Sequence, residues 1–231
     1  MKTIGMIGGM SWESSIEYYR IINETVRARL GSLHSAKSIT CSLDFAEIEV
    51  LQREARWDEA THLLVAAAQS VERAGADFIV ICTNTMHKVA DEVQRHIRIP
   101  ILHIADPTAE KIIGLGLKSV GLLGTKFTME EDFYKNRLTH KHGLEVIIPT
   151  TKERELVHRV IYDELCLGEA RHSSKAQYID IIRRLANEGA EGIILGCTEI
   201  GLLVQQEDSP VPLFDTAQIH AIAAVERALA A

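Results

Sequence analysis

Two short stretches of this sequence, CTNTMH at 82–87 and GCTEI at 196–200, combine a cysteine with hydroxyl-bearing and polar side chains. Each follows an apolar run, so each cysteine stands near the point where a buried strand reaches the surface. A thiol at such a point could act as a nucleophile or move a proton, because its ordinary pKa of about 8.5 lies close to neutral pH. The first question is which residue of each stretch carries the chemistry.

The elements that must position these residues follow a regular order. Apolar runs rich in Ile, Val and Leu alternate with longer segments of helical period, such as 57–75 and 175–189. The runs are short and bounded by Gly, Pro and charged residues, as strands of a buried parallel sheet are. They are TIGMIG (3–8), SITCSLDF (38–45), DFIVIC (77–82), IPILHI (99–104), SVGLLG (119–124), EVIIP (145–149), EGIILG (191–196) and VPLFD (211–215). This alternation predicts an α/β protein with parallel sheets.

The sequence also repeats itself. GADFIVICTNT (75–85) aligns without a gap with GAEGIILGCTE (189–199), and IGMIGG (4–9) aligns with VGLLGT (120–125). The matches occur in the same order in both halves, which indicates two homologous α/β units. We therefore predict a first domain of residues 1–105 plus the terminal helix 216–231, and a second domain of residues 106–215.

A third pair of matching segments lies near the ends of the two halves. Residues 99–109 and 211–217 each run from a Pro-led strand through an aspartate into a Thr-Ala helix start. We expect Asp106 and Asp215 to cap these helices. Ligands of open parallel sheets gather at the carboxyl ends of strands. Two facing halves would bring both strand-end motifs into one shared cleft.

The repeat also decides which side chains face that cleft. It places Cys197 opposite Thr83 and Gly196 opposite Cys82. Neighbouring side chains of a strand point to opposite faces, so Thr83 is expected to share the orientation of Cys197, while Cys82 points into the packing. Cys41 and Cys166 are interpreted as packing residues as well. We expect the thiolate of Cys197 to be favoured by the dipole of the helix that follows it.

Composition excludes several classes of function. The chain has 231 residues, 46% of them hydrophobic, and a net charge of -7, so no basic surface for a nucleic acid is expected. No apolar run is long enough to span a membrane, and no secretory signal is recognisable. Scattered cysteines indicate reduced thiols of a cytoplasmic protein. Nucleotide-binding motifs, metal-ligand spacings and a Schiff-base lysine for pyridoxal phosphate are all missing, so no metal and no cofactor is predicted.

Four motifs together, MIGGMSWES, NTMH, LLGTKFTME and GCTEI, resemble those of the aspartate/glutamate racemases that work without pyridoxal phosphate. The resemblance spans essentially the whole chain. It implies two pseudo-symmetric, Rossmann-like α/β domains with the active site in the cleft between them, a homodimer, and aspartate or glutamate as substrate. Members of this family carry one cysteine from each half on opposite sides of the substrate's α-carbon.

The sequence departs from the family pattern at one of these two positions. The first thiol normally stands directly before Asn-Thr, where this chain has Thr83, and Cys82 lies one residue too early. In the family the thiol of the second half serves the L-enantiomer, so the resemblance implies that Cys197 is the base that removes the α-proton of the L-enantiomer, and we interpret Thr83 as the opposing proton donor. An unassisted hydroxyl is a poor base, so the enzyme is expected to prefer L-aspartate or L-glutamate and to release the D-form.

The resemblance also suggests the residues that bind the substrate: Met10, Gln52, Asn84, Thr85, Thr125 and Thr198. Two alternatives stay open. Single-cysteine members of the wider superfamily decarboxylate aryl-substituted malonates or isomerise maleate. A chain that kept the cleft but lost one base could also be a catalytically weak amino-acid sensor.

Overall fold

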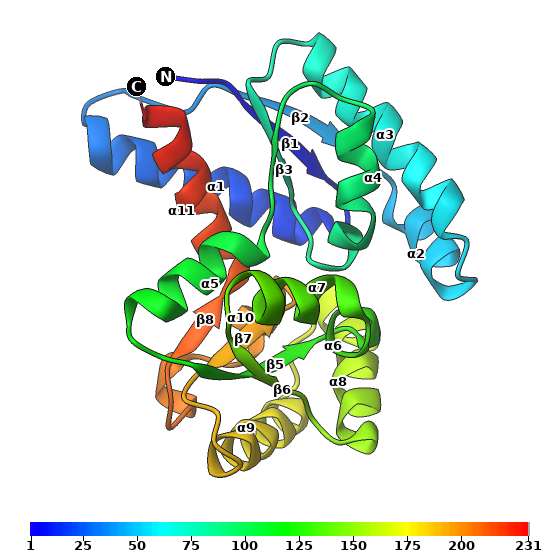
Figure 1. Ribbon diagram of the computed structural model, residues 1–231, viewed down its shortest axis with the longest axis vertical. Coiled ribbons are helices and arrows are strands. Elements are labelled where there is room, and N and C mark those ends of the chain that lie inside the picture. Colours follow the sequence, from blue (N-terminus) through cyan, green and yellow to red (C-terminus); the bar gives the residue numbers. More distant parts are fainter. Residues whose placement is uncertain (231) are drawn as a thin grey trace. The chain divides into compact units, whose positions relative to one another are not determined.

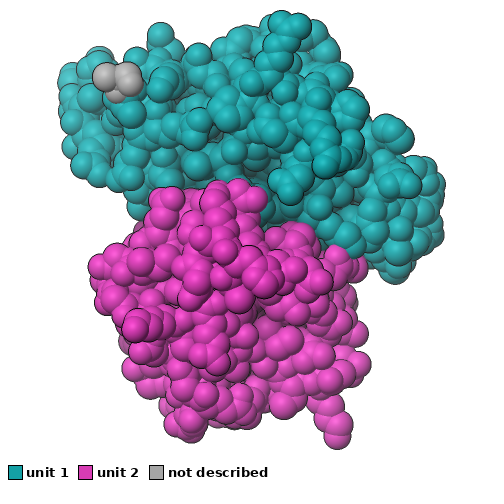
Figure 2. All heavy atoms as spheres, in the orientation of Figure 1, with its two compact units in different colours: residues 1–104, 220–231 teal, residues 105–219 magenta. Residues whose placement is uncertain are grey.

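A computed structural model describes residues 1–230 of the chain. These residues divide into two compact units, one formed by 1–104 with 220–230 and the other by Ala105–Ile219 (Figure 2). The chain therefore leaves the first unit once, after Ile104, and returns to it at His220.

The first unit contains a sheet of four parallel strands in the order β2-β1-β3-β4 (Figure 1). The strands are β1 (Ile4–Gly8), β2 (Ser38–Ser42), β3 (Phe78–Ile81) and β4 (Ile101–Leu102). Both central strands, β1 and β3, are buried along their whole length, because helices cover the two faces of the sheet.

Helices α1 (Trp12–Leu30) and α11 (Thr216–Leu229) lie on one face of this sheet, and α3 (Trp57–Arg73) and α4 (Ala90–Arg95) lie on the other (Figure 1). Helix α2 (Phe45–Arg53) packs against α3, and the 3-10 helix η1 (Thr85–Val89) joins β3 to α4.

The alternation of side chains along β3 separates the two faces. Ile79 and Ile81 belong to the apolar core formed with α3 and α4. Phe78, one residue away, lies under the guanidinium of Arg227 on α11, at 5.3 Å from the ring centroid. The side chains of β3 are all buried and pack alternately on the two faces of the sheet.

The second unit repeats this arrangement. Its sheet has four parallel strands in the order β6-β5-β7-β8. The strands are β5 (Ser119–Gly124), β6 (Glu145–Ile147), β7 (Ile193–Gly196) and β8 (Leu213–Asp215). In each sheet, the first and third strands of the unit lie side by side in the centre, and the second and fourth strands lie at the edges. The helices of this unit are α5 (Ala105–Gly114), α6 (Lys126–Glu130), α7 (Asp132–Asn136), the π-helix η2 (Arg137–Lys141), α8 (Thr151–Asp163), η3 (Leu165–Leu167), α9 (His172–Asn187), α10 (Ile200–Leu203) and η4 (Gln206–Asp208).

Two parallel sheets flanked by helices confirm the α/β class predicted from the alternating pattern. The strand expected over 38–45 is shorter than predicted, because it ends at Ser42. Asp44 stops it: its carboxylate accepts a hydrogen bond from the N–H of Ala46 at 3.0 Å and caps α2.

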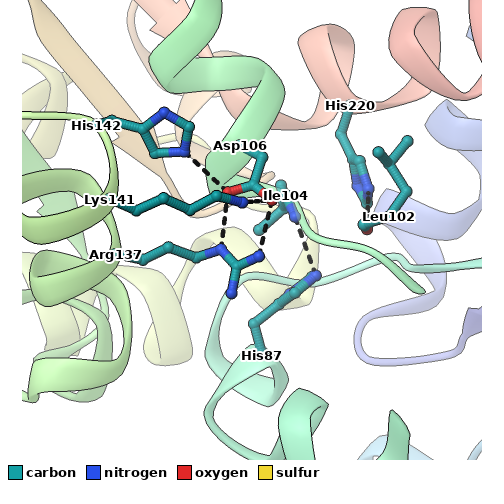
Figure 3. A network of polar contacts seen from close by, with 8 residues as sticks. All are labelled: His87, Leu102, Ile104, Asp106, Arg137, Lys141, His142 and His220. Atoms are coloured by element: carbon teal, nitrogen blue, oxygen red, sulfur yellow. Dashed lines mark hydrogen bonds and ion pairs between the residues drawn. The ribbon is translucent and has the colours of Figure 1, made fainter. Parts of the chain in front are cut away.

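The two aspartates expected to cap helices behave differently. Asp215 Oδ1 accepts the N–H of Gln218 at 3.0 Å, as a capping residue does. The prediction for Asp106 is wrong, because Asp106 lies within α5 as its second residue. Its carboxylate binds the side chains of Arg137, Lys141 and His142 instead (Figure 3).

None of the helices within residues 1–230 is both long enough and apolar enough to cross a membrane.

Candidate active site

Cys82 directly follows β3 and is fully buried. Its N–H donates to the carbonyl of Ile7 at 2.9 Å, which continues the strand pairing by one residue. Burial raises the pKa of this thiol far above its ordinary value, so the sulfur stays protonated and inert. The prediction that Cys82 is a packing residue is confirmed.

The corresponding position of the second unit is Gly196, the last residue of β7. A Cβ atom at Gly196 would come within 2.8 Å of the carbonyl oxygen of Leu123, so this position also faces the packed interior. In contrast, the next residues along the chain, Thr83 and Cys197, are both partly exposed. The alternation predicted from the repeat therefore holds in each unit separately.

Cys197 is placed beside a carboxylate. Its Sγ atom donates to Oε2 of Glu199 at 3.0 Å, and the same oxygen accepts the hydroxyl of Thr198 at 2.7 Å. Although Cys197 is partly exposed as a residue, desolvation of its thiol group and the charge of Glu199 raise the pKa of Cys197 well above its ordinary value. The thiol is therefore protonated in the free protein.

This result contradicts the expected effect of a helix dipole on Cys197. The helix that follows, α10 (Ile200–Leu203), is a single turn and begins three residues after the thiol. Its dipole is small, whereas the carboxylate of Glu199 is a full charge at hydrogen-bond distance. Glu199, which is itself buried, is a site residue that we did not predict. The sequence could have indicated this role, because Glu199 stands only two residues after Cys197.

Asn84 and Thr85 are buried at the start of η1, where the chain turns from β3 into the 3-10 helix. The carbonyl of Thr83 lies 2.8 Å from Nδ1 of His87 on the same turn. Thr83, Asn84 and Thr85 thus form one compact segment at the carboxyl end of β3.

Gln52 and Met10 lie in the same unit. The side-chain nitrogen of Gln52 is 3.0 Å from the sulfur of Met86, which belongs to η1, so Gln52 is held against the motif segment. Met10 follows β1 and is 4% exposed within the apolar core of the unit. β1 and β3 pair at Ile7 and Ile81, so the segments after both strands emerge at the same edge of the sheet.

Thr125 and Thr198 lie in the second unit with Cys197. Thr125 caps α6: its Oγ1 accepts the N–H of Thr128 at 3.3 Å. β5 and β7 pair at Gly124 and Gly196, so Thr125 and Cys197 follow neighbouring strands at one edge of the second sheet. The structure thus gathers the predicted residues into two groups, one in each unit.

The two other cysteines lie outside these groups. Cys41 is in β2 and packs against the core of the first unit, as predicted. Cys166 is in η3, and its charge would add to that of Glu199 in raising the pKa of Cys197. Within residues 1–230 there is no group of three or more His, Cys, Asp or Glu side chains placed to hold a metal ion.

Two solved structures are similar to this chain over essentially its whole length. A solved structure of a candidate Asp/Glu racemase from Yersinia pestis is 55% identical, with a TM-score of 0.93 and 100% of each chain covered. An aspartate racemase homologue from Pyrococcus horikoshii OT3 is 39% identical, with a TM-score of 0.84 and 99% of each chain covered.

A curated protein is also similar over much of its length. The broad specificity amino-acid racemase RacX of Bacillus subtilis (strain 168) is 26% identical over 174 residues, which are 75% of this chain and 74% of that protein. Residues 7–224 match the family model described as Asp/Glu/hydantoin racemase. The chain therefore belongs to the Asp/Glu/hydantoin racemase family and is an isomerase, as its resemblance to the aspartate/glutamate racemases predicted.

Proposed function

We propose that this enzyme interconverts L- and D-aspartate or L- and D-glutamate without a cofactor. The observation that carries the proposal is the matched exposure of Thr83 and Cys197, which hold corresponding positions in the two units while Cys82 is buried. Racemisation requires one group to remove the α-proton and a second group to protonate the opposite face of the same carbon. A thiol and a hydroxyl can divide these two tasks.

Cys197 is the proposed base for the L-enantiomer. It can act only after losing its own proton, and Glu199 is placed to accept that proton through the 3.0 Å contact between Sγ and Oε2. The resulting thiolate takes the α-proton and becomes a thiol again. Thr83 then donates its hydroxyl proton to the opposite face, which gives the D-enantiomer. It recovers a proton from water, and the hydroxide so formed takes the proton held by Glu199, which restores the starting state.

Asn84, Thr85 and Thr198 are the proposed ligands of the substrate's α-carboxylate. All three carry hydrogen-bond donors and lie within one or two residues of Thr83 or Cys197. The proposed binding set is completed by three more residues. Met10 follows β1, Gln52 contacts Met86 of η1, and Thr125 follows β5. Acidic amino acids are proposed because two similar solved structures are described as a candidate Asp/Glu racemase and an aspartate racemase homologue.

The preference for L-substrates follows from the unequal basicity of the two groups. A thiol ionises far more readily than a hydroxyl, so deprotonation from the Cys197 side is the easier reaction. Enantiomers have the same free energy, so kcat/KM must be equal in the two directions. The preference is therefore expected as a higher kcat and a higher KM for the L-enantiomer.

The test is an assay of L-aspartate and L-glutamate in deuterated buffer, with product handedness and α-deuterium measured together. Racemisation gives a D-product that carries deuterium. Cys197→Ala is expected to abolish it, whereas Cys82→Ala is expected to keep most of it. A Cys197→Ala enzyme with wild-type turnover would refute the assignment. Binding of the amino acid without any exchange would indicate a sensor, and turnover of a maleate or an arylmalonate in its place would indicate the isomerase or decarboxylase alternative.

We also propose that the enzyme works as a homodimer. The resemblance to the racemase family implies it, and the first unit offers an apolar surface on α1. Trp12, Ile16 and Tyr19 are 61%, 52% and 57% exposed and share one side of this helix by their spacing. Light scattering during size-exclusion chromatography is expected to give twice the chain mass, and Trp12→Glu is expected to lower it. A monomer at all concentrations would refute the proposal.

A cytoplasmic location is proposed as well, on the ground that the four cysteines are thiols and not disulfides. Fractionation of cells that produce the protein, followed by immunodetection, tests it. Recovery outside the cytoplasmic fraction would be the contrary result.

A further inference from the structure

We propose that His87 is a positioning residue for proton transfer by Thr83, acting as a neutral imidazole with its proton on Nδ1. The inference rests on the role proposed for Thr83 and adds a residue whose part in the reaction is otherwise unassigned. His87 lies in η1 and is 3% exposed.

Two backbone groups far apart in the sequence meet at this ring, and Figure 3 shows one of the two contacts, that with Ile104. On one side, Nδ1 lies 2.8 Å from the carbonyl oxygen of Thr83. On the other side, the backbone N–H of Ile104 donates to Nε2 at 3.2 Å. Ile104 is the last residue before the chain leaves the first unit.

These two contacts determine the tautomer. A backbone N–H can only donate, so Nε2 must carry a lone pair to receive the bond from Ile104. The carbonyl of Thr83 can only accept, so the ring proton must be on Nδ1. A protonated ring, or the tautomer with its proton on Nε2, would lose one of the two bonds. The geometry therefore requires a neutral imidazole with one defined tautomer.

The bond to Thr83 matters because of where Thr83 lies in the chain. β3 ends at Ile81 and η1 begins at Thr85, so Thr83 belongs to neither element. The N–H of Cys82, bound to Ile7, fixes the chain before Thr83, and the bond from His87 fixes the carbonyl after it. Anchors on both sides restrict the backbone torsions of Thr83 and so direct its hydroxyl. A group that transfers a proton depends on such alignment, since a displacement of about 1 Å can cost roughly 100-fold in rate.

The ring itself is held by a cluster of buried side chains. His103 packs against His87 with 4.5 Å between ring centroids, and His220 lies at 5.9 Å. His220 in turn contacts the hydroxyl of Tyr18 at 2.7 Å and the carbonyl of Leu102 at 2.8 Å. These contacts limit rotation of the imidazole and make it a rigid link between Thr83 and Ile104.

Two substitutions of His87 each remove one of its two hydrogen bonds, that with Thr83 or that with Ile104. His87→Asn keeps an amide N–H near the place of Nδ1 and can still donate to Thr83, but it loses the acceptor for Ile104. His87→Gln keeps an oxygen near the place of Nε2 and loses the donor to Thr83. The measurement uses L-aspartate in deuterated buffer and compares two products: D-aspartate, which needs Thr83, and deuterated L-aspartate, which needs only Cys197.

The expected result is a fall of about tenfold or more in the ratio of D-product to deuterated L-substrate for His87→Gln. For His87→Asn the ratio should stay within about threefold of the wild type, a change that corresponds to only a small displacement of the hydroxyl. His142→Asn is the matched control, because His142 is a mostly buried histidine of the second unit whose hydrogen bond goes to Asp106 and does not involve His87 or Thr83. It is expected to lower both products in parallel.

An unchanged ratio in His87→Gln, or an equal fall in His87→Asn, would overturn the proposal. Thr83→Val in the same assay separates it from the proposed function. If Thr83→Val still inverts the substrate, the role of Thr83 itself is wrong. A second measurement needs no variant: nitrogen NMR of the histidine rings in the wild-type enzyme should show the proton of His87 on Nδ1. A proton on Nε2 would contradict the assignment.

Discussion

The sulfur of Cys197 lies 3.0 Å from a carboxylate oxygen of Glu199, and that same oxygen receives the hydroxyl of Thr198. A thiolate at this distance from a carboxylate would be repelled, so the free protein keeps the proton on sulfur. The pair holds one transferable proton, and its movement to Glu199 is the step that would make the sulfur basic. This arrangement leads to the first prediction.

Glu199→Gln is expected to lower the pKa of Cys197, because a neutral amide no longer opposes the thiolate. The pH dependence of Cys197 alkylation by iodoacetamide, followed by peptide mass spectrometry, should therefore move to lower pH. Racemisation should nevertheless fall by about 10²–10⁴-fold, since the amide cannot accept the thiol proton. Glu207→Gln, at an exposed position in the same unit, should change neither quantity. A profile that stayed in place or moved to higher pH would show that Glu199 does not govern this thiol.

The stability of the protein should fall at alkaline pH because Cys82 is buried. Burial raises the pKa of this thiol in the folded state, so its contribution is complete below the unfolded-state pKa of about 8.5 and is lost as pH rises above it. One such thiol makes the free energy of unfolding decline by about 1.4 kcal/mol per pH unit in this range. Urea denaturation of Cys82→Ala between pH 8 and 10 should show a shallower decline than the wild type. Parallel curves would contradict the prediction.

Gly196→Ala should destabilise the second unit, because its Cβ atom would lie 2.8 Å from the carbonyl oxygen of Leu123. Overpacking of this kind costs about 1–3 kcal/mol. Gly114→Ala, on the same unit, is the matched control, since a Cβ atom there has no neighbour within 4 Å. Its effect should be below about 0.5 kcal/mol. Equal unfolding midpoints in urea for the two variants would show that the strand can shift to accept the methyl group.

Asp106 should stabilise the second unit through its three side-chain partners, of which Arg137 and Lys141 are cationic. Burial alone would raise its pKa, but hydrogen bonds from Arg137, Lys141 and His142 outweigh burial and hold the pKa far below the ordinary range. The stabilisation is therefore complete above pH of about 4 and is lost only as pH falls toward the lowered pKa. Asp106→Asn is expected to cost about 2 kcal/mol at neutral pH, because it removes the negative charge and one of the two oxygens that pair with the partly buried Arg137.

Lys141→Met provides the comparison for Asp106→Asn. The side chain of Lys141 is 52% exposed, and its ion pair should therefore contribute less than about 1 kcal/mol. Unfolding in urea at pH 7 and at pH 3 measures both variants. If Lys141→Met were as destabilised as Asp106→Asn, the exposed lysine and not Arg137 would be the main partner.

Much of the fold could be predicted from the sequence because its signals are local and repeated. Continuous apolar runs bounded by Gly and Pro indicate buried parallel strands, and the two aligned halves show the same strand order in the structure. The repeat also predicted the burial of Cys82. It aligns Cys82 with Gly196, and side chains at these two positions point to the packed side of their sheets because neighbouring side chains alternate between faces.

The remaining features depend on contacts that spacing does not determine. Asp106 and Asp215 occupy matching sequence positions, yet only Asp215 caps a helix, because η2 brings Arg137 to Asp106. The pKa of Cys197 depends on the side-chain conformation of Glu199, which outweighs the short helix that follows. The bond from Ile104 to His87 joins residues seventeen apart in the chain, and no periodic pattern indicates it.

The first unit is built from both extremities of the described chain. The N–H of Lys2 donates to the carbonyl of Ala228 at 2.8 Å, and Tyr18 on α1 contacts His220 on α11. The second unit, by comparison, is one uninterrupted stretch, Ala105–Ile219. During synthesis on the ribosome, this later stretch has all its residues available while the earlier unit still lacks a helix. Maturation of Thr83's surroundings must therefore wait until α11 has been translated.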